Sequence, residues 1–203
     1  LKKNKISKNW INRQRRDVYV RKSKIEGYRS RAVYKLEEIN QKFKIFHNGV
    51  SVLDLGAAPG SWTQYISKNY KNIKLASIDL KKFDEVENTF QITGDFTEDI
   101  YKQKILNFFQ GKIDVIISDM AVNTTGNKNL DSIQTSELCL DAMRFSKEVL
   151  KKNGIFVSKI FIGSTFNEII DESKKIFKKN KVFKPSASRK ESKESFIVCS
   201  MLR

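Results

Sequence analysis

Short apolar runs alternate along this chain with segments of helical periodicity. The apolar runs, which are typical of strands in a buried sheet, lie at residues 50–55, 75–79, 90–93, 113–119, 155–161, 181–183 and 194–202. Apolar residues recur at helical spacing in segments 31–43, 61–68, 131–150 and 165–179. This alternation predicts a single α/β domain built on a doubly wound, Rossmann-like sheet.

Two of these helices carry clear boundary signals. Ser30 is a favourable N-cap for helix 31–43, whose apolar stripe is Val33, Leu36, Ile39 and Phe43. Lys35 lies at the edge of that stripe rather than opposite it. Helix 131–150 is followed by two lysines and a glycine, a combination that predicts a helix C-terminus, at Lys151, Lys152 and Gly154.

A turn rich in small residues follows the strand at 50–55. Because Gly56 and Gly60 have no Cβ, the backbone there can approach a ligand closely. A dinucleotide-binding turn needs main-chain amides that reach a pyrophosphate, but this chain has Ala58 and Pro59, and proline has no N–H to donate. The turn therefore suits an uncharged nucleoside and disfavours a nicotinamide-dependent dehydrogenase. A pair of glycines can also serve an ordinary steric turn.

Two aspartates stand where such folds bind a nucleoside. Asp79 ends the strand at 75–79, about 20 residues past the glycines, where the ribose-binding carboxylate of these folds lies. Asp95 follows Gly94 directly after the strand at 90–93. An aspartate in that position also commonly caps a turn.

The charge balance indicates an acidic partner. The 203 residues include 39 Lys and Arg against 23 Asp and Glu, a net charge of +16, which favours nucleic acid as the partner. Residues 1–24 concentrate these cations around Trp10 and Tyr19. Cations with interleaved aromatic rings suit phosphate contact and base stacking, so this segment is predicted to be a basic RNA-binding extension. A solvated basic tail is the alternative.

Other residues narrow the class of protein further. No stretch approaches the roughly 20 apolar residues of a membrane span. Cys139 and Cys199 lie in apolar patterns without metal-ligand spacing and are expected to be reduced core residues in a reducing compartment. His47 has no partner cluster, so no metal site is predicted. Because the chain starts with Leu1 rather than Met, the compartment stays open between cytoplasm, nucleolus and an organelle.

Several motifs in a fixed order carry a resemblance to a known family. The motifs are Glu-Gly-Tyr-Arg-Ser-Arg-Ala-Val-Tyr-Lys-Leu (26–36), Asp-Leu-Gly-Ala-Ala-Pro-Gly-Ser-Trp (54–62), Ser-Asp-Met-Ala (118–121) and Val-Ser-Lys-Ile-Phe (157–161). With these motifs the chain resembles the FtsJ/RrmJ family of S-adenosylmethionine-dependent ribosomal RNA 2′-O-methyltransferases from about residue 17 to its C-terminus. The resemblance implies a class I methyltransferase sheet of seven strands with an antiparallel last strand.

Four ionisable residues match the family's catalytic tetrad. They are Lys35, Asp119, Lys159 and Glu194. A charge in or beside a buried strand needs a partner, so a structural ion pair is the ordinary explanation for each one alone. Taken together they imply that Lys159 acts as the general base or orients the ribose hydroxyl. Asp119 would then orient the ammonium, and Lys35 with Glu194 would hold the target ribose.

The resemblance also implies a set of residues that bind S-adenosylmethionine. This set is Gly56, Gly60, Trp62, Asp79, Asp95 and Asp119, with the methionine part near Gly60 and Trp62, the ribose on Asp79 and the adenine beside Asp95. Trp62 could instead simply pack on the sheet. The family commonly has a proline where this chain has Val122, which puts substrate detail in doubt.

The expected function is therefore S-adenosylmethionine-dependent methylation of an RNA ribose. The resemblance implies a uridine of large-subunit ribosomal RNA as the target, with the ribosomal particle as partner and a monomeric enzyme. A 2′-O-methyltransferase of the tRNA anticodon loop is the nearest alternative. A catalytically silent RNA-binding module is the other, and the complete tetrad argues against it.

Overall fold

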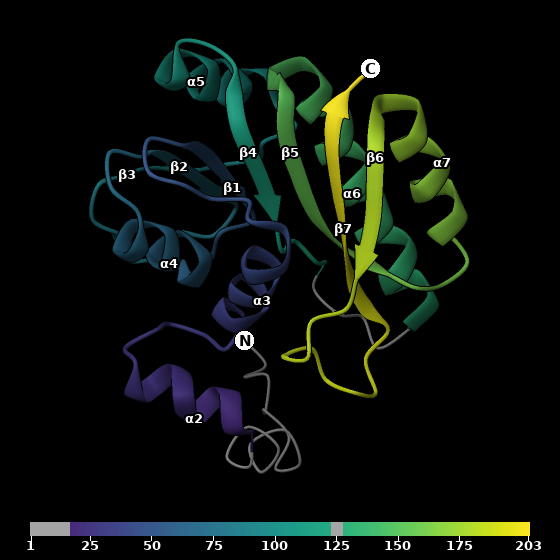
Figure 1. The fold of residues 1–203 in the computed structure, drawn as a ribbon, viewed down its shortest axis with the longest axis horizontal. Helices are drawn as coiled ribbons and strands as arrows, with labels where there is room; N and C mark the ends of the chain where they lie inside the picture. The colour runs from purple at the N-terminus through teal and green to yellow at the C-terminus, as the bar shows by residue number, and fades with distance from the viewer. Residues whose placement is uncertain (1–16, 123–127) are drawn as a thin grey trace, which may run out of the picture.

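A sheet of seven strands forms the centre of the computed structural model, which describes residues 17–122 and 128–203 (Figure 1). The strand order is β3-β2-β1-β4-β5-β7-β6. The strands are β1 (Ser51–Leu55), β2 (Lys74–Asp79), β3 (Thr89–Thr93), β4 (Ile113–Ser118), β5 (Leu150–Phe161), β6 (Phe177–Phe183) and β7 (Glu194–Leu202).

Helices cover both faces of this sheet (Figure 1). The helices are α2 (Val18–Ile25), α3 (Val33–Phe43), α4 (Ser61–Asn69), α5 (Asp99–Phe109), α6 (Lys128–Val149) and α7 (Phe166–Ile176). Helices α3 and α4 pack against one face, and α5, α6 and α7 against the other. In β1, Val52 faces α3 and α4 while Leu53 and Leu55 face the opposite side. Burial on both faces explains why the central strands are nearly continuous apolar runs.

The last strand runs against its neighbours. Strand β7 pairs antiparallel with both β5 and β6, while the other pairings are parallel. The seven strands and the antiparallel last strand are therefore confirmed. Because its direction is reversed, β7 begins at the edge where the parallel strands end, and Glu194 is its first residue.

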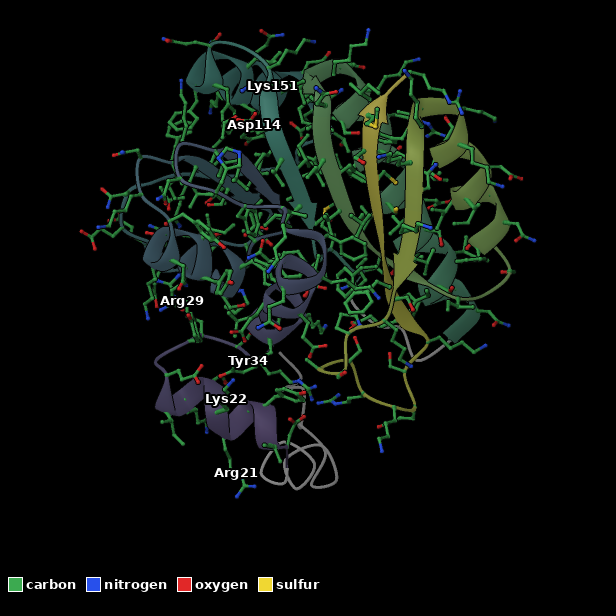
Figure 2. The ribbon with its side chains drawn as sticks, viewed as in Figure 1. Arg21, Lys22, Arg29, Tyr34, Asp114 and Lys151 are labelled. Carbon is green, nitrogen blue, oxygen red and sulfur yellow. The ribbon has the colours of Figure 1, made fainter. Side chains whose placement is uncertain are left out.

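The fifth strand begins earlier than predicted. Helix α6 ends at Val149, and Leu150 already pairs with Ile113 before the register shifts to Val115 and Ile155. The predicted helix end at residue 150 is correct to within one residue, but Lys151, Lys152 and Gly154 belong to β5 rather than to a helix C-terminus. Lys151 Nζ lies 2.7 Å from Asp114 Oδ1. Figure 2 shows this pair at the end of the sheet away from α2.

The helix predicted at 165–179 also ends early. Helix α7 stops at Ile176 and β6 starts at Phe177, whose ring stacks on Phe156 with centroids 6.0 Å apart. The lysines after Phe177 are exposed on this edge strand. The apolar pattern does not mark the boundary between α7 and β6, because Ile176 at the end of the helix and Phe177 at the start of the strand are both buried.

Two further local predictions differ from the structure. Helix α5 was not predicted; it covers the sheet with Ile105 and Phe109, four residues apart on one face. Ser30 does not cap α3, whose N-cap is Ala32 and lacks a side-chain hydrogen bond. Instead the Ser30 hydroxyl accepts the Ala32 amide at 3.2 Å and lies 2.8 Å from the Ser61 hydroxyl, so it joins the start of α3 to α4.

Helix α2 belongs to the segment predicted as a basic extension, and it packs on the domain. Asp17 caps it by accepting the amides of Tyr19 and Val20 at 3.1 and 3.3 Å. The rings of Tyr19 and Tyr34 lie 5.4 Å apart, and Lys22 Nζ lies 4.3 Å above the Tyr34 ring (Figure 2). Trp10 and the rest of residues 1–16 lie outside the described residues.

Both cysteines are buried free thiols. Burial raises the pKa of Cys139 to about 12, so this thiol stays protonated and unreactive. Among the described helices, none combines the length and the apolar character needed to cross a membrane.

Asp54 is a buried acid in the middle of the sheet. It is 1% exposed, and its Oδ2 accepts the Thr63 hydroxyl at 2.6 Å. Burial raises the pKa of Asp54 to about 7, and the Thr63 hydrogen bond only partly offsets this effect.

Asp54→Asn is therefore expected to remove a pH dependence of stability. The folded pKa lies above the unfolded one, so the contribution of Asp54 is fully present below about pH 4 and is lost as pH rises through about 7. The loss amounts to about 4 kcal/mol on the unfolding free energy. Urea unfolding at several pH values measures the difference between wild type and D54N, with the exposed Asp171→Asn as control. A constant difference between pH 4 and 8 would contradict the assignment.

Candidate active site

Four charged side chains from separate elements meet at the carboxyl edge of the sheet. Lys159 lies on the α3 side of β5, on the same face as Val157. Asp119 follows the end of β4, Glu194 opens β7, and Lys35 projects from the first turn of α3. Open α/β sheets bind their ligands at this edge. The structure thus brings together the four residues that the sequence singled out.

Their contacts form a row of alternating charges. Lys159 Nζ donates to the main-chain oxygen of Asp119 at 2.6 Å and lies 3.1 Å from Asp119 Oδ1. Asp119 Oδ2 lies 3.8 Å from Lys35 Nζ, which lies 2.8 Å from the Glu194 carboxylate. The Ser188 hydroxyl donates to Glu194 Oε1 at 2.8 Å. Asp119 is thus shared by two lysines, and Glu194 by Lys35 and Ser188.

The row is nearly buried, which strengthens its electrostatics. The side chains of Lys159 and Lys35 are 8% and 13% exposed, and that of Asp119 is 19% exposed. Burial lowers the pKa of Lys35, but the Asp119 and Glu194 carboxylates outweigh it, so the pKa is raised and Lys35 stays an ammonium. Burial raises the pKa of Asp119, but Lys159 and Lys35 outweigh it and the pKa is lowered.

A cavity of about 470 Å³ opens on one side of Asp119. Its volume falls within the range typical of small-molecule sites. Four of the predicted cofactor residues line it, namely Gly56, Asp79, Asp95 and Asp119. The cavity is also lined by Ala58 and by Met120, Ala121 and Val122, from the turn and the loop that the sequence analysis considered. The walls that sequence reasoning did not identify are Ile78, Leu80, Lys81, Gly94, Phe96 and Leu138.

The two predicted nucleoside-binding aspartates are both held by main-chain amides. Asp79 Oδ2 accepts the Ala58 amide at 2.9 Å and Oδ1 accepts the Lys81 amide at 2.8 Å. Asp95 Oδ1 accepts the amide and the hydroxyl of Thr97 at 2.9 and 2.7 Å. Asp95 therefore caps a turn and lines the cavity as well.

The two loop glycines adopt backbone conformations that other residues rarely take. Gly56 has φ +72°, and a Cβ there would lie 2.2 Å from Met120 Cγ. Gly60 has φ +95°, and a Cβ there would lie 2.8 Å from the Phe83 ring. Gly56 lines the cavity, whereas the space beside Gly60 is taken by Phe83 and Arg29.

Trp62 packs in the core beneath α3. Its side chain is buried, its indole N–H donates to the Ala32 carbonyl at 2.7 Å, and its ring lies 5.7 Å from that of Phe196. Neither Trp62 nor Gly60 lines the cavity. The indole instead supports the segment that leads into Lys35.

Arg29, which sequence analysis gave no role, clamps the glycine loop. Its guanidinium donates to the carbonyls of Pro59, Asp84 and Glu85 at 3.1, 2.7 and 2.7 Å. Figure 2 shows Arg29 between helix α4 and the segment of chain that leads into α3. Main-chain carbonyls far away in sequence leave no residue pattern, so this contact could not be predicted.

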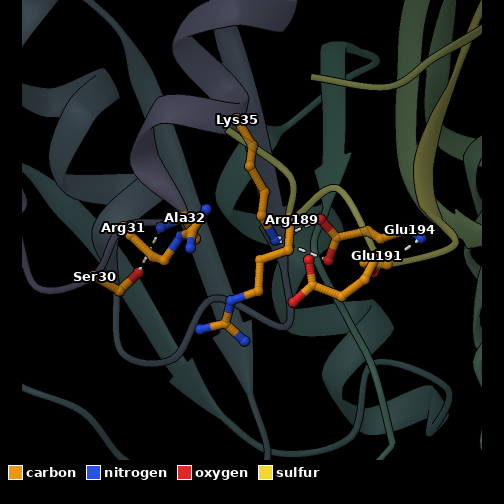
Figure 3. Close-up of a pocket in the computed structure, with 8 residues that line it drawn as sticks. Ser30, Arg31, Ala32, Lys35, Arg189, Glu191 and Glu194 are labelled. Carbon is orange, nitrogen blue, oxygen red and sulfur yellow. Dashed lines mark hydrogen bonds and ion pairs between the residues drawn. The ribbon is translucent and has the colours of Figure 1, made fainter. Parts of the chain in front are cut away.

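A second cavity, of about 400 Å³, lies at the Lys35 and Glu194 end of the charged row (Figure 3). It is lined by Ser30, Arg31, Ala32, Lys35, Arg189, Glu191, Ser192 and Glu194. Asp119 therefore borders one cavity, and Lys35 and Glu194 border the other. The two cavities have no lining residue in common.

The described residues contain no candidate metal site. Across 17–122 and 128–203, no group of three or more His, Cys, Asp or Glu side chains is arranged to hold a metal ion. His47 Nδ1 lies 2.8 Å from the Asn48 carbonyl on an exposed turn.

Comparison with known proteins gives consistent matches. A family model described as FtsJ-like methyltransferase matches residues 28–201. The chain is 63% identical over 203 residues to ribosomal RNA large subunit methyltransferase E of Pelagibacter ubique (strain HTCC1062), covering 100% of both. It is 46% identical over 198 residues to the protein of that name from Rickettsia akari (strain Hartford), covering 95% of this chain and 87% of that one.

A solved structure is also similar. A Plasmodium falciparum protein, named a ribosomal RNA methyltransferase, superposes with a TM-score of 0.77 at 34% identity. The match covers 86% of this chain and 98% of that one.

Asp119→Asn is expected to destabilise the protein strongly, because two nearly buried ammonium groups then lose their shared counter-charge. The loss should be about 3–5 kcal/mol in urea unfolding at pH 7. Glu194→Gln should lower the unfolding free energy by less, because Lys35 still has the Asp119 carboxylate as its counter-charge. The pKa of Asp119 is lowered, so its contribution is present above the unfolded carboxyl pKa and is lost as pH falls through the lowered folded value. An unfolding midpoint for D119N equal to that of wild type would disprove the shared ion pair.

Proposed function

This chain belongs to the FtsJ-like methyltransferase family, and from that premise we propose that it methylates a ribose 2′-hydroxyl of large-subunit ribosomal RNA with S-adenosylmethionine as the methyl donor. The substrate follows from the names of relatives that match along the whole chain. A uridine target rests on the family resemblance of the tetrad and its flanking motifs.

The observation that carries the proposal is the charged row between two cavities. Asp119 borders the larger cavity, and Lys35 and Glu194 border the smaller one. A methyl donor in the first would lie against Asp119, and a nucleotide in the second would lie against Lys35 and Glu194, with the Asp119–Lys35 contact between them. A transfer between two bound reactants needs an in-line approach.

The larger cavity suits the nucleoside part of the donor. The Asp79 carboxylate accepts two amides and offers about four lone-pair sites, so it can still accept ribose hydroxyls. Ile78, Phe96 and Leu138 supply apolar walls for a base. The Ala58 amide is already used by Asp79, and Pro59 has none, which fits an uncharged nucleoside better than a diphosphate. When bound, S-adenosylmethionine supplies a methyl group on a positively charged sulfur.

We assign Lys159 to the reacting hydroxyl. Asp119 holds its ammonium with two oxygens, so the group is fixed in direction rather than free to rotate. As an ammonium, Lys159 orients the 2′-hydroxyl by donating a hydrogen bond to its oxygen. Only its neutral amine has the lone pair needed to take up the hydroxyl proton while the oxygen gains the methyl group and the sulfur loses it. Lys35, kept charged by Asp119 and Glu194, donates hydrogen bonds to the ribose and to any negative charge that develops on its oxygen.

The basic N-terminal segment is the proposed RNA-binding extension. Within α2, Arg21, Lys22 and Lys24 are exposed, and Figure 2 shows Arg21 pointing away from the domain. Exposed cations beside the smaller cavity would neutralise RNA phosphates without sequence preference.

Lys159→Ala tests the proposed reaction. Single-turnover methyl transfer to large ribosomal subunits should fall at least 100-fold, because the hydroxyl loses its orienting group. S-adenosylmethionine affinity by calorimetry should stay within about twofold. Lys179→Ala, which removes an exposed lysine from β6, controls for the lost charge. Wild-type transfer to tRNA instead of ribosomal subunits would refute the substrate, and near wild-type rates for K159A would refute the role of Lys159.

Asp79→Ala tests the proposed donor site. Removal of the carboxylate should weaken S-adenosylmethionine binding about tenfold or more, since hydrogen bonds to a charged group are lost. Asp79→Asn keeps an acceptor for the Ala58 amide, so it separates the loss of loop support from the loss of ligand contact. Unchanged affinity of both variants by calorimetry would rule out Asp79 as a donor contact.

A further inference from the structure

Two arginines stand beside Lys35 in the smaller cavity, and neither belongs to the tetrad. Arg31 comes from the turn before α3, and Arg189 from the loop between β6 and β7. Figure 3 shows the Arg189 side chain between Arg31 and Glu191. Arg31 also donates to the Ala187 carbonyl, which ties the two segments together.

Both arginines already hold an anionic oxygen of this chain. Asp17 Oδ2 pairs with Arg31 and lies 3.7 Å from Arg189. The other oxygen, Oδ1, caps α2. The Asp17 side chain is only 10% exposed, so it fills the space between the guanidinium groups. Guanidinium groups bind carboxylate and phosphate oxygens with the same planar geometry.

The remaining charges of the cavity favour an anion there. Its lining has three cations, Arg31, Lys35 and Arg189, against the carboxylates of Glu191 and Glu194. Glu194 is already bound by Lys35 and Ser188. Asp17 neutralises the surplus positive charge, and an incoming phosphate could do the same.

We propose that Arg31 and Arg189 bind a backbone phosphate of RNA next to the methylated ribose, and that Asp17 occupies this site in the free protein. The inference rests on the proposed function, because a ribose held at Lys35 and Glu194 carries its 3′-phosphate on the carbon next to the 2′-hydroxyl. RNA then binds by displacing Asp17 Oδ2, while Oδ1 continues to cap α2.

Asp17→Asn separates the two roles of this residue. Asparagine is as good an N-cap as aspartate, so α2 is kept while the competing charge is removed. Binding of a short fluorescein-labelled single-stranded RNA, followed by anisotropy, should tighten about twofold to fivefold, the scale of one partly exposed ion pair. S-adenosylmethionine affinity should not change.

Asp99→Asn is the matched control. Asp99 is also an aspartate at the start of a helix, but it lies on α5 and its side chain is 95% exposed. This variant raises the net charge by the same amount, so a general charge effect would tighten RNA binding equally in both. An equal gain in D17N and D99N would overturn the proposal.

Arg189→Ala supplies a second measurement that does not depend on α2. RNA affinity should fall about tenfold, and the slope of log affinity against log salt should decrease by about one phosphate contact. In the R189A background, Asp17→Asn should give a smaller gain than in wild type, because one of the two competing partners is gone. An unchanged salt slope for R189A, or no tightening for D17N, would overturn the site.

Methyl transfer by the wild type keeps the two proposals apart. If wild type fails to methylate ribosomal subunits, the proposed function fails, whatever the RNA affinities show. If wild type methylates them and D17N and R189A bind RNA like wild type, only the phosphate site fails.

Discussion

One carboxylate shared by two nearly buried lysines is the interaction on which the site depends. Ammonium groups at this depth need a counter-charge, and Asp119 supplies it to Lys159 and Lys35 at once. The strands β4 and β5 must therefore end side by side, and α3 must lie across their ends. Glu194 then completes the row from β7. Asp119 also borders the larger cavity, and Lys35 and Glu194 border the smaller one.

The sequence was sufficient for the parts of the fold that burial on both faces determines. Continuous apolar runs located the inner strands, and the strand at 194–202 was predicted with its observed bounds. Lys159 was conspicuous as a charge in an otherwise apolar strand, but it was the family resemblance that joined the four residues into a tetrad. The starts of β5 and β6 were missed because Leu150 and Phe177, the first residue of each strand, are buried apolar residues that also continue the helical pattern before them. Helix α5 was missed because its exposed apolar Ile100 blurs the stripe of Ile105 and Phe109.

The rest of the site arises from contacts between distant segments, which leave no local pattern. Arg29 binds the carbonyls of Pro59, Asp84 and Glu85, and any residue at those positions would present the same oxygens. Asp17 looked like one acid among many cations until the fold brought it to Arg31 and Arg189. The position of Trp62 was equally open in the sequence. Its indole contact with the Ala32 carbonyl depends on how α3 lies over α4.

The reversed strand β7 has a consequence for when the enzyme becomes competent. It lies between β5 and β6, so β6 joins the sheet only through residues made after it. Glu194 is the first residue of β7, so it is synthesised after Asp119 and Lys159, which lie at the same edge of the sheet. A nascent chain whose β7 is still inside the ribosomal tunnel therefore lacks both the link between β6 and the rest of the sheet and the carboxylate that pairs with Lys35. Synthesis must pass β7 before the charged row is complete.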